Sequence, residues 1–199
     1  MRWRKLGQSP SASVGVADVA TRRINPLWLV LGGLGAVLLV AGAIVAAPRL
    51  FGGAVRRVVA WRGLIRRIAE DEGVDPVLIA AHMAAESGGD PAAVRSEPAL
   101  RDRSIGLMQV LCQTARRFVT ASRCDDLFDP ELNVRTGARI IRDNLQRYGG
   151  NIPNAIAAYN AGSAFKDTQG RFVNTKGVPS VQGYVDRVLA FRQQLQGQV

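Results

Sequence analysis

The sequence has few of the residues on which most enzyme chemistry depends. It contains one histidine and two cysteines among 199 residues. A single histidine without a G-x-S-x-G motif argues against a serine–histidine–aspartate triad. No phosphate-binding glycine loop of the Walker or dinucleotide-binding type is present. Because zinc sites need several histidines or closely spaced cysteines, we expect no metal and no cofactor.

Acidic residues are scarce relative to basic ones. The chain has 16 Asp and Glu against 26 Lys and Arg, a formal charge of +10. This balance suits an anionic partner, and by itself it does not choose among nucleic acid, anionic lipid and an acidic polymer. Five arginines closely follow a long apolar segment: Arg56, Arg57, Arg62, Arg66 and Arg67. Basic residues in that position meet lipid headgroups more often than nucleic acid, so we expect no nucleic-acid partner.

Residues 24–48 contain no charged side chain. Such a run is long enough to cross a hydrocarbon core of about 30 Å as a helix. A buried core helix and a cleaved signal peptide are alternatives, but the apolar run is longer than the usual signal-peptide core. We therefore predict an uncleaved membrane span. Small residues four apart, such as Gly32 and Ala36, would let two spans pack closely, so self-association is open. Basic residues flank both ends and leave the orientation undetermined.

The pattern predicts a mainly α-helical protein with four segments. They are a basic flexible tail (1–23), the span (24–48), a basic juxtamembrane linker (49–61) and a catalytic domain (62–199). Apolar spacing, caps and glycine stops predict the helices. The predicted helices cover residues 55–72, 76–86, 130–148, 154–159 and 181–195. Residues 163–180 read as a hairpin or a loop, and no strand-rich region is expected.

The two cysteines, Cys112 and Cys124, allow two interpretations. They form a disulfide if the domain faces an oxidising compartment, or they are two free thiols in a packed domain. Sequence alone cannot place their Cβ atoms, so both interpretations stay open.

Carboxylate chemistry remains after these exclusions, and Glu86 is the leading candidate. It ends the apolar run "AAHMAAE", just before two glycines. Burial in such a place raises the pKa of a carboxyl group and keeps it protonated near neutral pH, as a general acid requires. His82, in the same predicted helix, is interpreted as an ordinary packed histidine.

Six motifs occur in a fixed order along the chain. They are "ESGGDP" (86–91), "SIGLMQ" (104–109), "TARRF" (114–118), "LFDPELNVRTGARII" (127–141), "AIAAYNAG" (155–162) and "YVDRVL" (184–189). Together, over residues 62–192, this series resembles the soluble-type lytic transglycosylases, glycoside hydrolase family twenty-three, which are related to goose-type lysozyme. The resemblance implies a lysozyme-like helical domain that binds and cleaves peptidoglycan.

The resemblance also implies residue roles. Glu86 would be the single catalytic acid and base, and Ser87 would bond near it or contact the sugar. Tyr159 would hydrogen-bond to the carboxylate of Glu86. The remaining residues that the resemblance assigns to the substrate groove are Gly106, Leu107, Met108, Gln109, Asn160 and Tyr184. The sequence departs from the family pattern at Cys112, where relatives have proline, and at Gly88–Gly89–Asp90, where many have a bulkier residue and asparagine.

The implied reaction cuts the β-1,4 bond between N-acetylmuramic acid and N-acetylglucosamine and leaves a 1,6-anhydro sugar. Two alternatives stay open: a hydrolytic muramidase acting on the same bond, and a glycan-binding assembly module of a phage or secretion machine. We expect a single-pass membrane protein whose enzymatic domain faces the cell wall, in the periplasm or outside. A phage virion component or lysis protein is the alternative setting.

Overall fold

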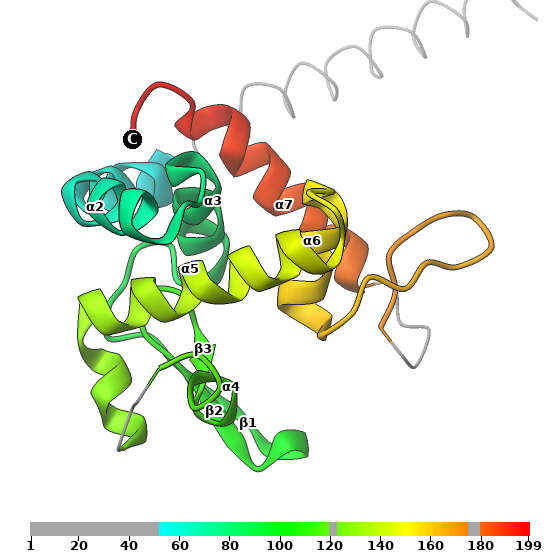
Figure 1. Ribbon diagram of the computed structural model, residues 1–199, viewed down its shortest axis with the longest axis horizontal. Coiled ribbons are helices and arrows are strands. Elements are labelled where there is room, and N and C mark those ends of the chain that lie inside the picture. The colour runs from blue at the N-terminus through cyan, green and yellow to red at the C-terminus, as the bar shows by residue number, and fades with distance from the viewer. Residues whose placement is uncertain (1–51, 120–122, 175–179) are drawn as a thin grey trace, which may run out of the picture. The chain divides into compact units, whose positions relative to one another are not determined.

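The computed structural model describes residues 52–119, 123–174 and 180–199 (Figure 1). The predicted tail (1–23) and the predicted span (24–48) lie outside the described residues. Among the described residues, no helix has both the length and the apolar character needed to cross a membrane.

The described part of the chain is mainly helical, as predicted. The five longer named helices are α2 (Arg62–Glu72), α3 (Pro76–Glu86), α5 (Pro130–Arg147), α6 (Ile152–Ala161) and α7 (Ser180–Leu195). Residues 52–60 are also helical, and we call them the leading helix. The short elements are η1 (Pro98–Leu100), α4 (Cys112–Ala115) and η2 (Cys124–Phe128). The helix predicted over 55–72 is interrupted by a turn at Trp61.

Side-chain caps explain where three of these helices begin. Asp75 accepts a hydrogen bond from the amide of Val77 at the start of α3, and Pro76 opens the helix. Asp129 caps α5 in the same way, and Asn151 caps α6. A capping side chain satisfies an amide that has no partner inside the helix, which fixes these boundaries locally.

A small antiparallel sheet was not predicted. Its strands are β1 (Val94–Glu97), β2 (Asp102–Ile105) and β3 (Val110–Leu111), in the order β1-β2-β3. The sequence analysis expected no strand-rich region and did not predict these three short strands. The segments "VRSE" and "DRSI" lack the apolar alternation that marks a half-buried strand, and backbone pairing with each other holds them together instead.

Helix α5 runs through the middle of the domain, between α2 and α3 on one side and the sheet on the other (Figure 1). Val134, Ala138 and Ile141, which repeat at helical spacing along α5, are fully or almost fully buried. Helix α3 packs against α7, and α6 contacts both α5 and α7. These packed helices place the C-terminal end of α3 beside the sheet and the start of α7.

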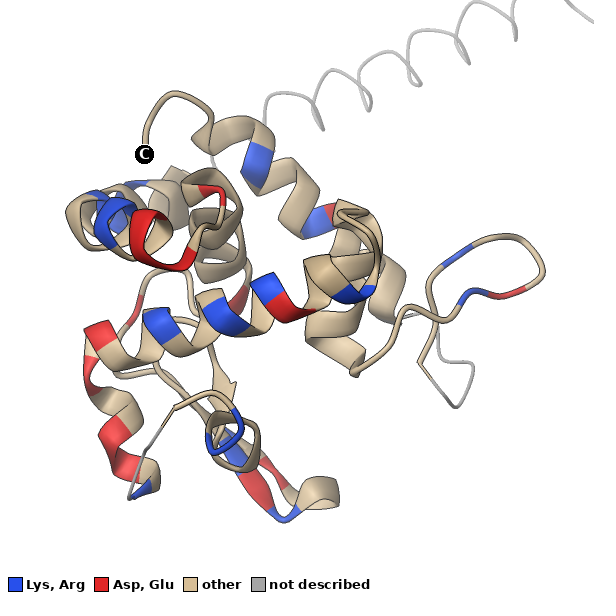
Figure 2. Cartoon of the chain, viewed as in Figure 1, with Lys and Arg blue, Asp and Glu red and all other residues tan. Residues whose placement is uncertain are grey.

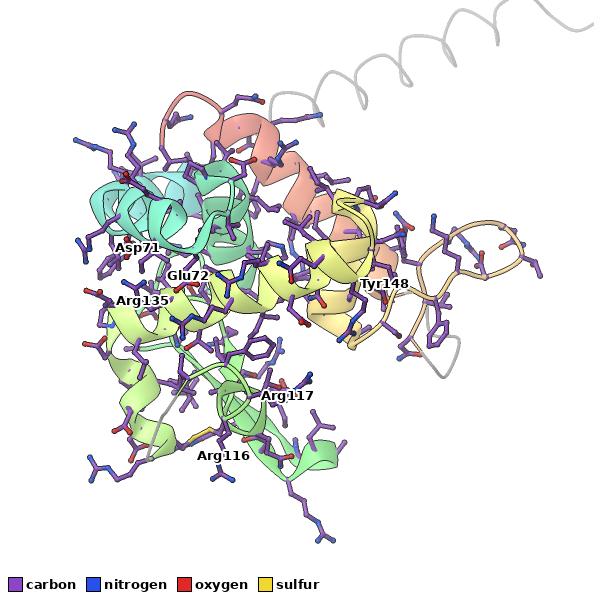
Figure 3. The ribbon with its side chains drawn as sticks, in the orientation of Figure 1. Asp71, Glu72, Arg116, Arg117, Arg135 and Tyr148 are labelled. Atoms are coloured by element: carbon purple, nitrogen blue, oxygen red, sulfur yellow. A yellow bond between two sulfur atoms is a disulfide. The ribbon has the colours of Figure 1, made fainter. Side chains whose placement is uncertain are left out.

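An ion-pair cluster joins α2 to α5. The carboxylate of Glu72 is 5% exposed and pairs with Arg139 at 2.9 Å and Arg142 at 2.8 Å. Arg135 also reaches Glu72, at 3.3 Å, and Asp71, at 2.9 Å. Figure 2 shows how basic residues recur along α5, and Figure 3 shows Asp71, Glu72 and Arg135 near one another at this contact. A buried carboxylate needs such partners, so this cluster fixes how α2 lies on α5.

The structure also shows the state of the two cysteines and a contact within the segment predicted as a hairpin or loop. Cys112 and Cys124 form a disulfide that ties α4 to η2. In the predicted hairpin or loop, Lys166 and Phe172 form an isolated antiparallel bridge.

Candidate active site

Glu86 is the last residue of α3 and is partly buried. Burial raises the pKa of its carboxyl from 4.5 to about 7. The hydrogen bond from Tyr184 and the positive charges of Arg95 and Arg187 oppose this shift, while the negative charge of Glu97 adds to it. Desolvation prevails because a charged carboxylate loses most of its hydration there. A group with this pKa can both give and take a proton near neutral pH.

Tyr184 and His82 form a hydrogen-bonded row that ends at Glu86. The Tyr184 hydroxyl donates to Oε1 of Glu86 at 2.6 Å, and Nδ1 of His82 lies 2.9 Å from the same hydroxyl. Burial lowers the pKa of His82 to about 3, so its ring is neutral. Because the tyrosine proton points to Glu86, we assign the imidazole proton to Nδ1.

Sequence reasoning missed His82 as a site residue. The signal that would have found it is its position four residues before Glu86, which places both side chains on one face of α3. Tyr184, which the resemblance assigned to the substrate groove, is hydrogen-bonded to Glu86 in the structure.

Tyr159 lies beside this row but does not make the bond expected of it. Its hydroxyl donates to the carbonyl of Met108 at 2.8 Å, and its ring centroid is 4.6 Å from that of His82. Burial, and secondarily the negative charge of Glu86, raise the pKa of Tyr159 well above its ordinary value. In this structure Tyr184 is the tyrosine that bonds the carboxylate, because it enters from α7, which packs directly on α3.

The segment Gly106–Gln109 approaches the site with its backbone. The side chains of Leu107 and Met108 are fully buried, so the expectation that they line a groove is corrected: they pack in the core. Met108 fills the space beside Gly137, where an added Cβ would lie 2.8 Å from the methionine side chain. Gly106 has φ +77°, and a Cβ there would lie 2.5 Å from Nδ2 of Asn133. Only glycine fits that turn.

Gln109 and Asn133 hold this turn in place. Gln109 has φ +45°, and its side-chain amide donates to the carbonyls of Ala93 and Gly106. Asn133, from α5, donates to the carbonyls of Ile105 and Leu127 and accepts from the amide of Met108. Sequence reasoning missed Asn133, whose position within a helix motif gave no indication of three loop contacts.

Ser87 links the end of α3 to the same turn. Its hydroxyl donates to the carbonyl of Leu107 at 2.8 Å and accepts from the amides of Gly89 and Asp90. The structure therefore brings Glu86, Ser87, Tyr184 and the Gly106–Gln109 backbone together, while Asn160 is exposed at the end of α6.

Comparison with known proteins identifies the domain. The model of the family described as "Transglycosylase SLT domain" matches residues 63–178. The chain belongs to this family. The recognition made from the six motifs is thereby confirmed.

Relatives and a solved structure agree with the SLT assignment. The chain is 35% identical over 138 residues to "Membrane-bound lytic murein transglycosylase C" of Edwardsiella ictaluri, covering 60% of this chain and 37% of that protein. It is 31% identical over 103 residues to "Transglycosylase" of Enterobacteria phage PRD1, covering 52% and 35%. An inactive glutamate-to-glutamine mutant of lytic transglycosylase Slt from Pseudomonas aeruginosa superposes with a TM-score of 0.56 at 27% identity, covering 68% of this chain and 24% of that one. The chain thus spans little more than a third of the two curated relatives.

Clefts open on the described surface of the SLT domain. A cleft of about 320 Å³ lies between α5, α6 and the segment from β3 through α4 to Phe118, and its lining includes Tyr159 and Asn160. A second, of about 530 Å³, lies at the sheet and the disulfide, and its lining includes Arg103 and Cys112. Glu86 belongs to the lining of neither cleft, whereas Tyr159 connects the first one to the His82 row.

A second carboxylate stands near Glu86 in the SLT domain, on β1. Glu97 accepts hydrogen bonds from Arg95 at 2.6 Å and from the Ser104 hydroxyl at 3.1 Å. The guanidinium of Arg187 lies 5.5 Å from the centroid of the Tyr184 ring. The described residues include no group of three or more His, Cys, Asp or Glu side chains that could hold a metal ion.

Proposed function

We propose that this chain is a peptidoglycan lytic transglycosylase that uses Glu86 as its single acid and base. The observation that carries the proposal is the carboxyl of Glu86, whose pKa burial raises to about 7 while Tyr184 fixes one of its oxygens. The Pseudomonas neighbour is an inactive glutamate-to-glutamine mutant, which supports a glutamate as the reacting group.

In the first step, protonated Glu86 donates its proton to the glycosidic oxygen that leaves N-acetylmuramic acid. The acetamido group of the same sugar assists at C1. The hydrogen bond from Tyr184 holds Oε1 and leaves Oε2 for the substrate. General acid catalysis of this kind requires a carboxyl that is still protonated at working pH, which the raised pKa provides.

In the second step, the carboxylate of Glu86 takes the proton from the C6 hydroxyl, and that oxygen attacks C1. The 1,6-anhydro ring closes without water. Most glycosidases need a second carboxylate as nucleophile or base. Glu97, whose negative charge helps to raise the pKa of Glu86, is a candidate for that role, but its Oε1 is engaged by Arg95 and Ser104. This arrangement favours the intramolecular C6 hydroxyl over a water molecule activated by a second acid.

The test is the chemistry of the product. Purified sacculi are digested with the wild-type chain and with Glu86→Gln, and the muropeptides are analysed by mass spectrometry. We expect 1,6-anhydro-muramic ends, 18 Da lighter than reducing ends, from the wild type, and a loss of about a thousandfold in rate for the variant. Reducing ends alone would make the chain a hydrolytic muramidase. Sacculus binding without turnover would make it a glycan-binding module.

We further propose that residues 24–48 anchor the chain in a membrane, with the domain from about residue 62 facing the cell wall. The uncharged run supports this, as does the name of the Edwardsiella relative. The phage relative supports a phage setting as the alternative. Alkaline carbonate extraction of cells tests the anchor. The full chain should remain in the pellet and a chain lacking residues 24–48 should be released, whereas release of both would exclude an integral span.

A further inference from the structure

The leading helix (residues 52–60) and the turn after it lie on the loop that follows Glu86. Nε of Arg57 donates to the carbonyl of Gly88 at 2.8 Å. Nε1 of Trp61 donates to the carbonyl of Gly89 at 3.2 Å. The carbonyl groups of Gly88 and Gly89, which follow Glu86 by two and three residues, thus both accept hydrogen bonds from this helix and turn.

The backbone conformation favours glycine at both positions, and the close contact itself requires glycine at Gly89. Gly88 has φ +62° and Gly89 has φ +84°, a region that other residues rarely adopt. A Cβ on Gly89 would lie 3.1 Å from both the carbonyl carbon of Arg57 and the amide nitrogen of Val58, which are backbone atoms and cannot move aside. A Cβ on Gly88 would lie 2.8 Å from Nη2 of Arg57. The departure from the family pattern at "GGD" therefore coincides with the place where the leading helix docks.

The loop transmits this contact to the site. The amide of Gly89 donates to the hydroxyl of Ser87, and that hydroxyl donates to the carbonyl of Leu107. The carbonyl of the next residue, Met108, accepts from Tyr159. Arg57 and Trp61 thus hold the outer side of a loop whose inner side supports Glu86 and the Gly106–Gln109 turn.

The leading helix is not part of the matched family domain. The family model begins at residue 63. Val58 is nevertheless fully buried in the core, and Val55, Val59 and Trp61 pack against it. A packed helix that precedes the matched residues therefore lies directly against the loop beside the proposed catalytic residue.

We propose that the leading helix and the turn after it form a positioning element of the active site, in which Arg57 on the helix and Trp61 in the turn clamp Gly88–Gly89 and so fix the orientation and burial of Glu86. This inference rests on the proposed lytic transglycosylase function. Neither residue contacts the reacting atoms; both act through the loop. Misplacing a catalytic group by about 1 Å can cost up to about a hundredfold in rate, so a clamp of two hydrogen bonds is large enough to matter.

The experiment uses the full chain with Arg57→Ala, Trp61→Phe and the double variant. Trp61→Phe keeps an aromatic ring and removes the N–H donor. Arg56→Ala is the matched control, because Arg56 is exposed on the same helix and next to Arg57. We measure kcat and KM on sacculi or soluble glycan strands, the pH dependence of kcat, thermal melting, and amide hydrogen exchange of Gly89 and Asp90.

We expect the double variant to lower kcat roughly tenfold with KM changed less than about twofold, since orientation and not binding is lost. Exchange at Gly89 and Asp90 should accelerate, and the basic limb of the pH profile should move to lower pH as Glu86 gains water. Arg57→Lys, which restores a donor, should recover part of the rate. Arg56→Ala should match the wild type in every readout.

Three results would overturn the proposal. They are unchanged kcat in the double variant, faster exchange at Gly89 and Asp90 without loss of kcat, and an equal loss of kcat in Arg56→Ala. Failure of the proposed function is a separate result, because it would leave the wild type without 1,6-anhydro product. In that case the exchange measurement still tests the clamp. Unchanged exchange at Gly89 and Asp90 in the double variant would show that Arg57 and Trp61 do not hold this loop.

Discussion

The hydroxyl of Tyr184 lies 2.6 Å from Oε1 of Glu86, although 98 residues separate the two along the chain. The same hydroxyl is 2.9 Å from Nδ1 of His82, which is neutral because burial lowers its pKa to about 3. Within this row, the partly buried carboxyl of Glu86 has one neutral hydrogen-bond donor, the Tyr184 hydroxyl, and no positively charged partner. This arrangement lets burial dominate the pKa of Glu86 while its geometry stays fixed.

Replacing Tyr184 with phenylalanine should raise the pKa of Glu86 further. The hydrogen bond from Tyr184 lowers this pKa, so its loss leaves the protonated form favoured to a pH above 7. We expect the basic limb of the kcat profile to move to higher pH, and kcat to fall about tenfold because the carboxylate is a poorly oriented base.

Tyr148→Phe is the matched control for that variant. Tyr148 caps the C-terminal end of α5 (Figure 3), where its hydroxyl accepts a hydrogen bond from the amide of Ala164. Its pH profile should match that of the wild type. A basic limb that moves to lower pH in Tyr184→Phe would contradict the role assigned to this hydrogen bond.

Glu86→Gln should stabilise the fold at neutral and alkaline pH. The pKa of Glu86 is raised in the folded state, so the unfolded chain releases this proton first as pH rises above 4.5. The wild type should therefore lose up to about 3 kcal/mol of unfolding free energy between pH 4.5 and 7. Urea unfolding at pH 4.5 and pH 8 checks this. The gain of the variant over the wild type should grow with pH, and an equal difference at both values would refute it.

His82→Asn should remove the loss of unfolding free energy that the buried, neutral imidazole of His82 causes as the pH falls below 6.5. The folded pKa of about 3 lies below the ordinary 6.5, so the unfolded chain binds this proton first as pH falls. Between pH 6.5 and 5 this costs the wild type about 2 kcal/mol, in the opposite direction to Glu86. We expect the unfolding free energy of the variant to rise as pH falls over this range. Asparagine keeps an N–H donor near the Tyr184 hydroxyl, and a variant curve parallel to that of the wild type would be the contrary result.

Glu72→Ala should destabilise the domain by about 3 kcal/mol, because it removes the buried centre of an ion-pair cluster and leaves three arginines of α5 without it. Asp143→Ala is the control, since its pair with Arg147 has both side chains 45% exposed, and such pairs contribute less than about 0.5 kcal/mol. Urea midpoints measure both. Turnover at 25 °C should be unchanged in each, and equal destabilisation of the two variants would contradict a special role for Glu72.

Much of the helical frame could be predicted from local pattern. The predicted helices 76–86 and 130–148 match α3 and α5 to within one residue, and Asp75 and Asp129 cap their starts. These features depend on residues a few positions apart, which sequence spacing describes directly. The sheet was not predicted, because its strands are held by backbone pairing and carry little apolar alternation.

By itself, the sequence determined that carboxylate chemistry at Glu86 was the available chemistry, because other catalytic groups were missing and six motifs stood in order. Only the tertiary structure decided which partners that carboxyl has. Tyr184 from α7 bonds it, Tyr159 from α6 turns instead to a carbonyl, and the leading helix closes on the glycines that follow. The pKa of Glu86 depends on desolvation by surroundings drawn from distant segments, and burial of that kind exists only once the helices have packed.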